Sequence, residues 1–342
     1  MRSVINLQTF LAAVFVFGLL ITSHEFGHFI TAKLSNVKVL EFSLGMGPKL
    51  FGFKTKETDY SLRILPIGGY VKMLGEEEQC TDPRAFCNQS PWKRLIIIVA
   101  GAFMNFLIAV ILFILVAYNL GVVKPIVSSV EAGYPAMSAG VKPNDKILMV
   151  NEQKIYTWNQ FKEFISENKD KPFKMTVKRD NNIIEINLKP VYNKNEDRYL
   201  VGISPKLVKG DLIESIRTGF SETITSIKQM IIFLGKIFKG EFSTNDVGGP
   251  VAIVKMSGEA AKVGLWNLLF FAGFLSINLG VFNLIPFPAL DGGWVIILLY
   301  EAITGKKIDE NKIGLINLIG FAILMAFAIL VTFKDIIRLS SY

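Results

Sequence analysis

The two histidines of this chain lie four residues apart with an acid between them, in the segment His24-Glu25-Phe26-Gly27-His28. Residues i and i+4 share one face of a helix, so both imidazoles can reach a single Zn²⁺. Glu25 would then lie beside a metal-bound water and act as the general base. The alternative is three incidental polar positions, which the cost of ionisable groups in an apolar helix disfavours. The spacing therefore predicts a zinc site that performs hydrolysis.

A catalytic zinc generally has three protein ligands and one open position. Because the chain has no third histidine, a carboxylate is needed. Asp291 is the acid that closes the otherwise uncharged run Val263–Leu290. Pro286 and Pro288 cannot continue a regular helix, and a broken helix would bring Asp291 to the metal. Asp291 is thus the candidate third ligand.

The elements that must position these residues are membrane helices. Of the 342 residues, 51% are hydrophobic, which is more than an ordinary soluble domain has. Three uncharged runs, Leu95–Val123, Val263–Leu290 and Ile313–Phe333, each reach the roughly 20 residues that cross a bilayer. Phe10–Ala32 is a fourth candidate, interrupted by the motif. A cleaved signal peptide is disfavoured there, because no small-residue cleavage site closes the stretch.

The composition between the second and third runs is polar and mixed, which predicts an inserted soluble domain. Alternation of apolar and polar residues in 173–178 and 183–188 predicts two antiparallel strands that turn at Asp180-Asn-Asn, and Trp158–Glu167 predicts a helix. Leu212–Lys239 predicts an amphipathic helix that lies on the outer membrane face or packs on the inserted domain.

In chain order we expect a first transmembrane helix at 7–33, a β-loop region at 34–94, a second transmembrane helix at 95–122, the inserted domain at 123–205, a helical linker at 206–262, a third transmembrane segment at 263–293 and a fourth transmembrane helix at 313–333.

Basic residues in the short loops predict the orientation. Segments 33–94 and 301–312 are rich in Lys and Arg and should be cytoplasmic, so segment 123–205 and both termini should be outside. We interpret the net charge of +8 as a result of this topology and of contact with anionic lipid, and we expect no nucleic-acid partner. Cys80 and Cys87 lie in the predicted cytoplasmic loop, where we expect reduced thiols without a metal role.

Several motifs together resemble the site-2 protease family, specifically its bacterial RseP type. They are HExxH in the first span, Ser276-Ile-Asn-Leu-Gly, and Asn283-Leu-Ile-Pro-Phe-Pro-Ala-Leu-Asp291-Gly-Gly. Residues 133–151 and 155–161 also resemble a bacterial PDZ domain. The resemblance covers nearly the whole chain. It implies a multi-pass α-helical membrane protein with four transmembrane helices, a cytoplasmic-side reentrant β-loop and an inserted extracytoplasmic α+β PDZ domain, located in the bacterial cytoplasmic (inner) membrane.

The same resemblance implies the roles of individual residues. His24, His28 and Asp291 would bind one Zn²⁺ per chain, and Glu25 would be the general base for hydrolysis of peptide bonds within the membrane. The substrates would be single-span membrane proteins, such as anti-sigma factors or signal-peptide remnants. Residues Asn278 and Asn283 would hold the substrate backbone. Segment 41–49 would be the reentrant β-loop, in which Gly45 and Gly47 allow close backbone approach. From the residues alone, this segment is a Gly-rich turn between β-prone stretches.

Alternatives remain open at this point. The PDZ-like domain could capture a peptide C-terminus by strand addition, or it could be a folded spacer. The space holds one such domain, whereas proteobacterial members of the family usually carry two. A rival function is a catalytically inactive, membrane-embedded PDZ adaptor or chaperone, against which the intact motif residues argue. A transporter with a proton relay is a further rival, but no internal repeat supports it.

Overall fold

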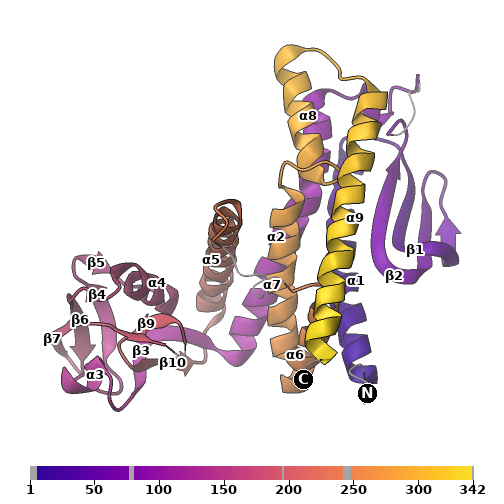
Figure 1. Ribbon diagram of the computed structural model, residues 1–342. Coiled ribbons are helices and arrows are strands. Elements are labelled where there is room, and N and C mark those ends of the chain that lie inside the picture. Colours follow the sequence, from indigo (N-terminus) through magenta and orange to yellow (C-terminus); the bar gives the residue numbers. More distant parts are fainter. Residues whose placement is uncertain (1–5, 77–80, 195, 242–247, 341–342) are drawn as a thin grey trace. The chain divides into compact units, whose positions relative to one another are not determined.

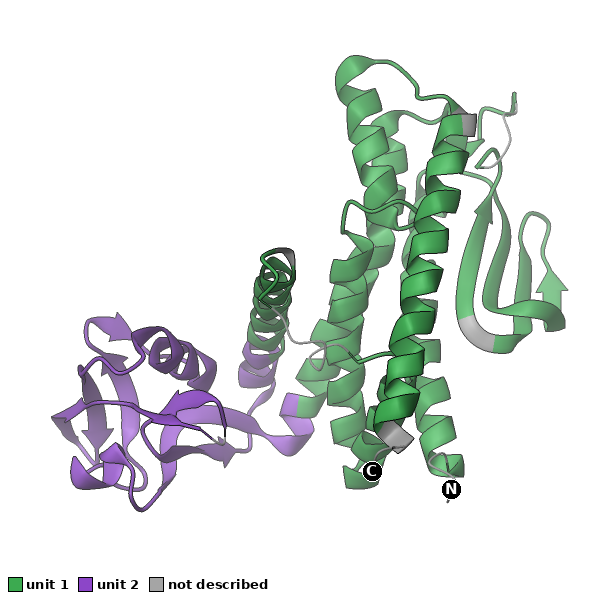
Figure 2. Cartoon of the chain, viewed as in Figure 1, with its two compact units in different colours: residues 1–116, 219–342 green, residues 117–218 purple. Residues whose placement is uncertain are grey.

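The computed structural model describes residues 6–76, 81–194, 196–241 and 248–340. The chain divides into two compact units (Figure 1, Figure 2). Unit 1 comprises residues 1–116 and 219–342 and is mainly helical, and unit 2 comprises residues 117–218 and is rich in strands. Unit 2 extends beyond the predicted insertion at 123–205, because its first strand begins at Val122 and its last strand ends at Val208.

Long helices stand side by side in unit 1 (Figure 1). They are α1 (Leu7–Leu34), α2 (Pro91–Leu120), α6 (Pro250–Val263), α7 (Leu265–Asn283), α8 (Asp291–Thr304) and α9 (Glu310–Ser340), with a short 3₁₀ helix, η1 (Phe86–Asn88), before α2. Within the described residues, four helical stretches are long and apolar enough to cross a membrane: α1, α2, α7 and the part of α9 from Lys312 to Arg338. This confirms the predicted multi-pass membrane protein.

The predicted third transmembrane segment is divided into separate helices. A break at Gly264 divides α6 from α7, and α7 ends at Asn283. After the loop that holds Pro286 and Pro288, α8 begins at Asp291. The broken helix was expected, but α8 itself was not predicted. Its first residue is the charge at which the uncharged run ends, and a carboxylate is favourable at a helix N-terminus because of the helix dipole.

The β-loop region forms a sheet that is more extensive than the predicted turn. Strands β1 (Val39–Lys54) and β2 (Asp59–Met73) pair antiparallel and pack against α1. Both strands bend, so Phe42 lies beside Val71 on one side and beside Tyr60 on the other. Gly45 and Gly47 lie in the bend of β1 with φ of 85° and 84°. Such angles favour glycine, which explains both residues at this turn.

The helical linker predicted at 206–262 contains α5 (Leu212–Phe238) and α6. The C-terminal half of α5 belongs to unit 1, where Ile227 and Met230 contact a cluster with Ala109 and Phe113 of α2. Its predicted location, on the outer membrane face or on the inserted domain, stays a prediction. Apolar residues at helical spacing fix which face is buried but not its partner. Of the two cysteines, Cys87 is free and half-buried, and Cys80 lies outside the described residues.

Unit 2 is built on a sheet with the strand order β10-β3-β4-β6-β7, and β5 pairs with β4. Two-residue hairpin geometry joins β6 to β7 at Asp180, as the alternation pattern predicts. The predicted helix at 158–167 corresponds to α4, which begins with a capping box between Thr157 and Gln160. The elements of the unit are β3 (Val122–Val130), α3 (Pro135–Ser138), β4 (Lys146–Val150), β5 (Gln153–Lys154), α4 (Trp158–Asn168), β6 (Phe173–Arg179), β7 (Asn182–Leu188), β8 (Val191–Asn193), β9 (Arg198–Leu200) and β10 (Ile203–Val208).

Candidate metal centre

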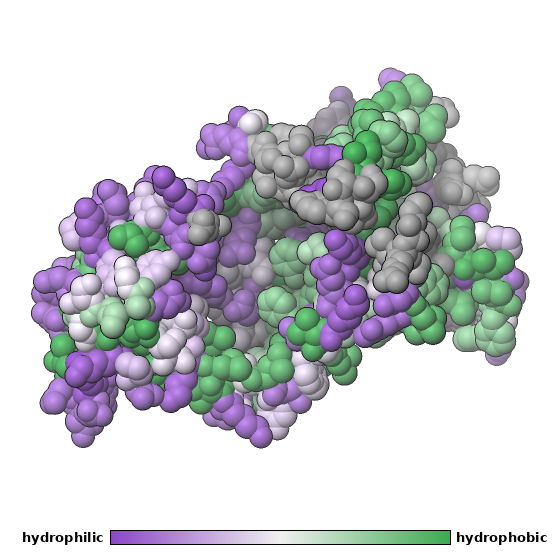
Figure 3. All heavy atoms as spheres, turned by 60° about the horizontal axis from the view of Figure 1, so that its bottom comes forward, coloured by the Kyte–Doolittle hydropathy of each residue, from purple (hydrophilic) through white to green (hydrophobic). Residues whose placement is uncertain are grey.

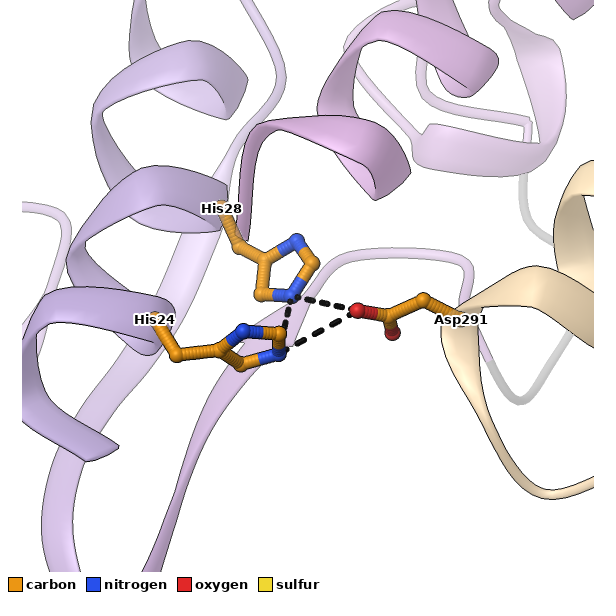
Figure 4. A group of neighbouring side chains, drawn as sticks. All are labelled: His24, His28 and Asp291. Carbon is orange, nitrogen blue, oxygen red and sulfur yellow. Dashed lines mark hydrogen bonds and ion pairs between the residues drawn. The ribbon is translucent and has the colours of Figure 1, made fainter. Parts of the chain in front are cut away.

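His24, His28 and Asp291 converge in unit 1 (Figure 4). The two histidines point from one face of α1, and Asp291 reaches them from the first residue of α8. The Nε2 atoms of the histidines are 3.1 Å apart. Oδ2 of Asp291 lies 3.2 Å from Nε2 of His24 and 3.5 Å from Nε2 of His28. Asp291, which follows His24 by 267 positions and His28 by 263, is thereby brought into one cluster with them.

The geometry of these three atoms fits a zinc ion. Zinc bonds of about 2.0–2.1 Å in a tetrahedron place neighbouring ligand atoms about 3.3 Å apart. The three observed separations, 3.1, 3.2 and 3.5 Å, lie around this value. The histidines are only 9% and 7% exposed, and Oδ2 of Asp291 has no hydrogen-bond partner among the described residues. The cluster can therefore hold one metal ion and leave a fourth coordination position open.

The ring of His28 is oriented by the backbone of α2. Its Nδ1 lies 2.9 Å from the carbonyl oxygen of Ile97. A carbonyl oxygen only accepts hydrogen bonds, so Nδ1 carries the proton and Nε2 keeps its lone pair for a metal. On His24, Nδ1 lies 3.3 Å from Nδ2 of Asn105, which is also on α2. Sequence reasoning missed Asn105, although an asparagine within the uncharged run Leu95–Val123 was a signal.

Two glycines allow α2 to approach the motif. A Cβ at Gly27, between the two histidines, would lie 2.2 Å from the carbonyl oxygen of Ala100. A Cβ at Gly101 would lie 2.4 Å from Nε2 of His28. Either contact is closer than atoms can approach, so a side chain at either position would separate the helices. These glycines also were not singled out from the sequence.

The loop between α7 and α8 folds back over the first turn of α8. A Cβ at Gly292 would lie 2.1 Å from the carbonyl oxygen of Ile285, and a Cβ at Gly293 would lie 2.7 Å from that of Phe287. The Gly-Gly that follows Asp291 therefore serves close packing of backbone on backbone. This packing fixes the start of α8, and with it the carboxylate.

The structure brings some of the other predicted residues to this cluster. Glu25 is half-buried and interacts electrostatically with His24, His28 and Asp291. Nδ2 of Asn283 lies 3.4 Å from each ring nitrogen of His24.

The remaining predicted residues lie elsewhere in unit 1. Asn278 is half-buried on α7. The close approach at Gly45 is internal to the sheet, because a Cβ there would lie 2.5 Å from the carbonyl oxygen of Leu65. Gly47 is exposed in the same bend of β1.

The model of peptidase family M50 matches residues 12–327 of the chain. The chain belongs to peptidase family M50. A Clostridium acetobutylicum protein that bears the provisional name of a zinc metalloprotease is 47% identical over 326 residues, covering 95% of this chain and 96% of that protein. The zinc metalloprotease RasP of Bacillus licheniformis is 30% identical, covering 97% of this chain and all of that protein. The regulator of sigma-W protease RasP of Bacillus subtilis is 29% identical, with coverage of 97% and 99%.

These matches confirm the family resemblance predicted from the motifs. This M50 peptidase is a zinc metalloprotease of the site-2 protease type, and its cofactor is Zn²⁺. Its apolar helices embed it in a membrane. The family assignment also argues against the rival expectation of a catalytically inactive adaptor or chaperone.

Proposed function

We propose that this M50 peptidase cleaves peptide bonds in or near the transmembrane segment of single-span membrane proteins. His24, His28 and Asp291 are the proposed zinc ligands. The observation that carries the proposal is their convergence, with ligand atoms 3.1–3.5 Å apart, on a helix that is long and apolar enough to cross a membrane. Ionisable side chains are costly at membrane depth, so a zinc peptidase that acts in water is not expected to carry its site on such a helix.

Glu25 is the proposed general base. When bound, zinc supplies a Lewis acid that polarises a peptide carbonyl and makes a bound water more acidic. The Glu25 carboxylate takes the proton of the attacking water and then gives it to the leaving amine nitrogen. Its place on the helix turn between the two histidines keeps it beside the reacting atoms. The amide of Asn283, beside His24, can donate a hydrogen bond to the substrate backbone, and we assign Asn278 the same task from the family pattern.

The β1–β2 sheet is the proposed reentrant β-loop. Its apolar side chains at the bend are exposed, among them Leu50 at 64% and Phe51 at 70%. Such exposure suits contact with lipid or with an apolar substrate segment. A substrate helix must unwind before attack, and strand pairing would satisfy the amides that unwinding frees. Gly47, exposed in the bend, leaves room for this approach, and Gly45 allows the bend itself by its close contact with Leu65.

The site is proposed to open toward the cytoplasm, with the PDZ-like unit 2 outside the inner membrane. The basic loops at 33–94 and 301–312 support this orientation. A cavity of about 280 Å³ lies beside these loops, lined in part by Glu76, Trp294 and Lys307. Unit 2 would then select substrates, either by excluding bulky ones or by sensing a trimmed C-terminus.

Reconstitution tests this function. The full-length protein in lipid vesicles is mixed with a single-span model substrate, and cleavage is followed by gel and mass spectrometry. We expect cleavage to stop with Glu25→Gln and with a zinc chelator, and to persist with Glu152→Gln, the same chemical change at an exposed turn of unit 2. Cleavage that survives Glu25→Gln would refute the assigned base.

A further inference from the structure

Asn105 contacts His24 on the ring nitrogen that faces away from the metal position. Its Nδ2 lies 3.3 Å from Nδ1 of His24, whereas Nε2 of the same ring lies 3.2 Å from Asp291. The Asn105 side chain is fully buried, at 0% exposure. Its amide oxygen Oδ1 has no hydrogen-bond partner among the described residues. A buried amide oxygen without a hydrogen bond costs free energy, so this atom is expected to accept a hydrogen bond in the functional state.

The imidazole of His24 can donate this hydrogen bond. A neutral histidine that binds a metal through Nε2 carries its proton on Nδ1, and that N–H needs an acceptor. For His28 the acceptor is the Ile97 carbonyl oxygen, 2.9 Å away. For His24 the neighbour is an amide, which holds an acceptor and a donor on one planar group. Half a turn about the Cβ–Cγ bond of Asn105 brings Oδ1 to the place of Nδ2, where the unpartnered oxygen gains a donor.

We propose that Asn105 is a positioning residue that accepts the Nδ1 proton of His24 and thereby selects the tautomer that binds zinc through Nε2. This inference rests on the proposed function, because it takes His24 as a zinc ligand. Asn105 acts through His24 and does not touch the substrate. The two histidines then have equivalent supports from α2, one from the backbone and one from a side chain.

The packing around Asn105 holds it in place for this role. Ser276 of α7 donates from Oγ to the backbone oxygen of Asn105 over 2.8 Å, and Ser276 is itself fully buried. Helices α2 and α7 are thus joined at the turn that carries the amide. Asn283 also lies near His24, but its Nδ2 is 3.4 Å from both ring nitrogens and so does not distinguish between the tautomers.

Zinc affinity of the full-length protein in detergent micelles, measured by competition with a chromophoric chelator, tests the inference. Asn105→Leu keeps the approximate volume and removes the acceptor, and we expect it to weaken zinc binding about 10- to 100-fold. Asn105→Asp keeps an acceptor at the same place, and we expect an affinity close to that of the wild type. Ser257→Ala is the matched control, because this buried hydroxyl donates only within its own helix, to Ile253.

The tautomer can be observed directly, because the chain has just two histidines. In ¹⁵N-histidine-labelled, zinc-loaded protein purified without a histidine tag, we expect both rings to carry the proton on Nδ1. Asn105→Leu should alter the His24 signals and leave those of His28 unchanged. A purely structural role would instead lower the unfolding temperature of both Asn105 variants and leave the zinc affinity of the folded protein unchanged, which would overturn the inference.

His24→Ala separates this inference from the proposed function. If His24→Ala binds zinc as tightly as the wild type, the proposed ligand set fails. If zinc binding requires His24 but Asn105→Leu retains wild-type affinity and a protonated Nδ1, only the role of Asn105 is wrong.

Discussion

Unit 1 and unit 2 differ in the polar side chains that they bury and in the apolar side chains that they expose. Unit 2 buries an apolar cluster that includes Val127, Ile147 and Val177, as a water-soluble domain does. Unit 1 buries polar side chains, among them Asn105 and Ser276, and exposes apolar side chains along α9. Figure 3 shows mainly hydrophilic side chains over unit 2 and broad hydrophobic areas on unit 1.

The difference follows from the solvent of each unit. In water, burial of apolar surface drives folding, so unit 2 needs a continuous apolar core. In a bilayer, lipid is as apolar as leucine, and helices associate through close packing of small residues and through polar contacts. The close approach of α1 and α2 at Gly27 and Gly101 is packing of the first kind, and the metal cluster is a polar contact. The chemistry of unit 1 and the cohesion of its helices therefore depend on the same residues.

The largest expected effect comes from removing a carboxylate of the unit 1 interior. Asp291→Ala should abolish zinc binding and lower proteolysis by about 10³-fold or more, because several kcal/mol of transition-state stabilisation are lost with the metal. Metal analysis and the vesicle cleavage assay measure the two quantities. Glu259→Ala, at an exposed position of α6, is the control. Zinc retained at full stoichiometry in Asp291→Ala would exclude Asp291 as a ligand.

The buried ion pair of unit 1 should be the next most sensitive site. Nη1 of Arg94 lies 2.9 Å from Oε2 of Glu301, with both side chains under 10% exposed. Arg94→Leu leaves Glu301 buried and unpaired, so we expect a loss of about 3–5 kcal/mol in the free energy of unfolding. Denaturant titration in micelles measures it. The double variant with Glu301→Leu should recover most of the loss, and failure to recover would mean that packing of the arginine matters more than its charge.

The corresponding pair of unit 2 should respond less, because water reaches it. Arg179 donates to the fully buried Asp145 over 2.7 Å and is itself 24% exposed. Arg179→Leu should cost about 1.5–3 kcal/mol, the usual range for a hydrogen bond to a charged group. The same denaturant titration measures it, with Arg198→Leu at an exposed position as the control. A cost larger than that of Arg94→Leu would contradict the comparison of the two units.

The Asp145 pair also predicts a dependence on pH. Burial alone would raise the pKa of the Asp145 carboxyl, but hydrogen bonds from Arg179 and from the Lys142 backbone N–H lower this pKa below its ordinary value. A lowered pKa in the folded state means that the stabilisation is present above about pH 4 and is lost as the pH falls further. The difference in unfolding temperature between the wild type and Asp145→Asn should therefore shrink from pH 7 to about pH 3. A constant difference would show that the carboxylate charge is not what stabilises unit 2.

The smallest expected effect is at a helix cap in unit 1. Oδ2 of Asp335, near the end of α9, accepts a hydrogen bond from the Ala252 N–H in the first turn of α6. Gly249, which precedes α6, provides no side-chain cap of its own. Asp335→Ala should cost about 1 kcal/mol, as the loss of an N-cap does. Thermal unfolding in micelles measures it, and Asp335→Asn, which keeps an acceptor oxygen, should lose less.

Much of the fold could be predicted from local patterns. Three uncharged runs and one apolar stretch interrupted by the motif predicted the four spans, and alternation predicted β6 and β7, because both signals are local. Long-range contacts were not predictable in this way. α8 was missed because its first residue is charged. The contact of α5 with α2 was not predictable, because an apolar stripe on a helix does not show which element covers it.

The sequence by itself determined the chemistry of this protein. The spacing of His24, Glu25 and His28 on a helix, and the need for a carboxylate in a chain without a third histidine, already point to zinc hydrolysis. Only the tertiary structure decided how the site is held. The approach of α2 at Gly27 and Gly101, the Ile97 and Asn105 contacts to the two rings, and the loop folded over Gly292 all join residues far apart in the chain. Close packing between distant segments leaves no periodic trace in the sequence, because each contact involves a single residue on each helix.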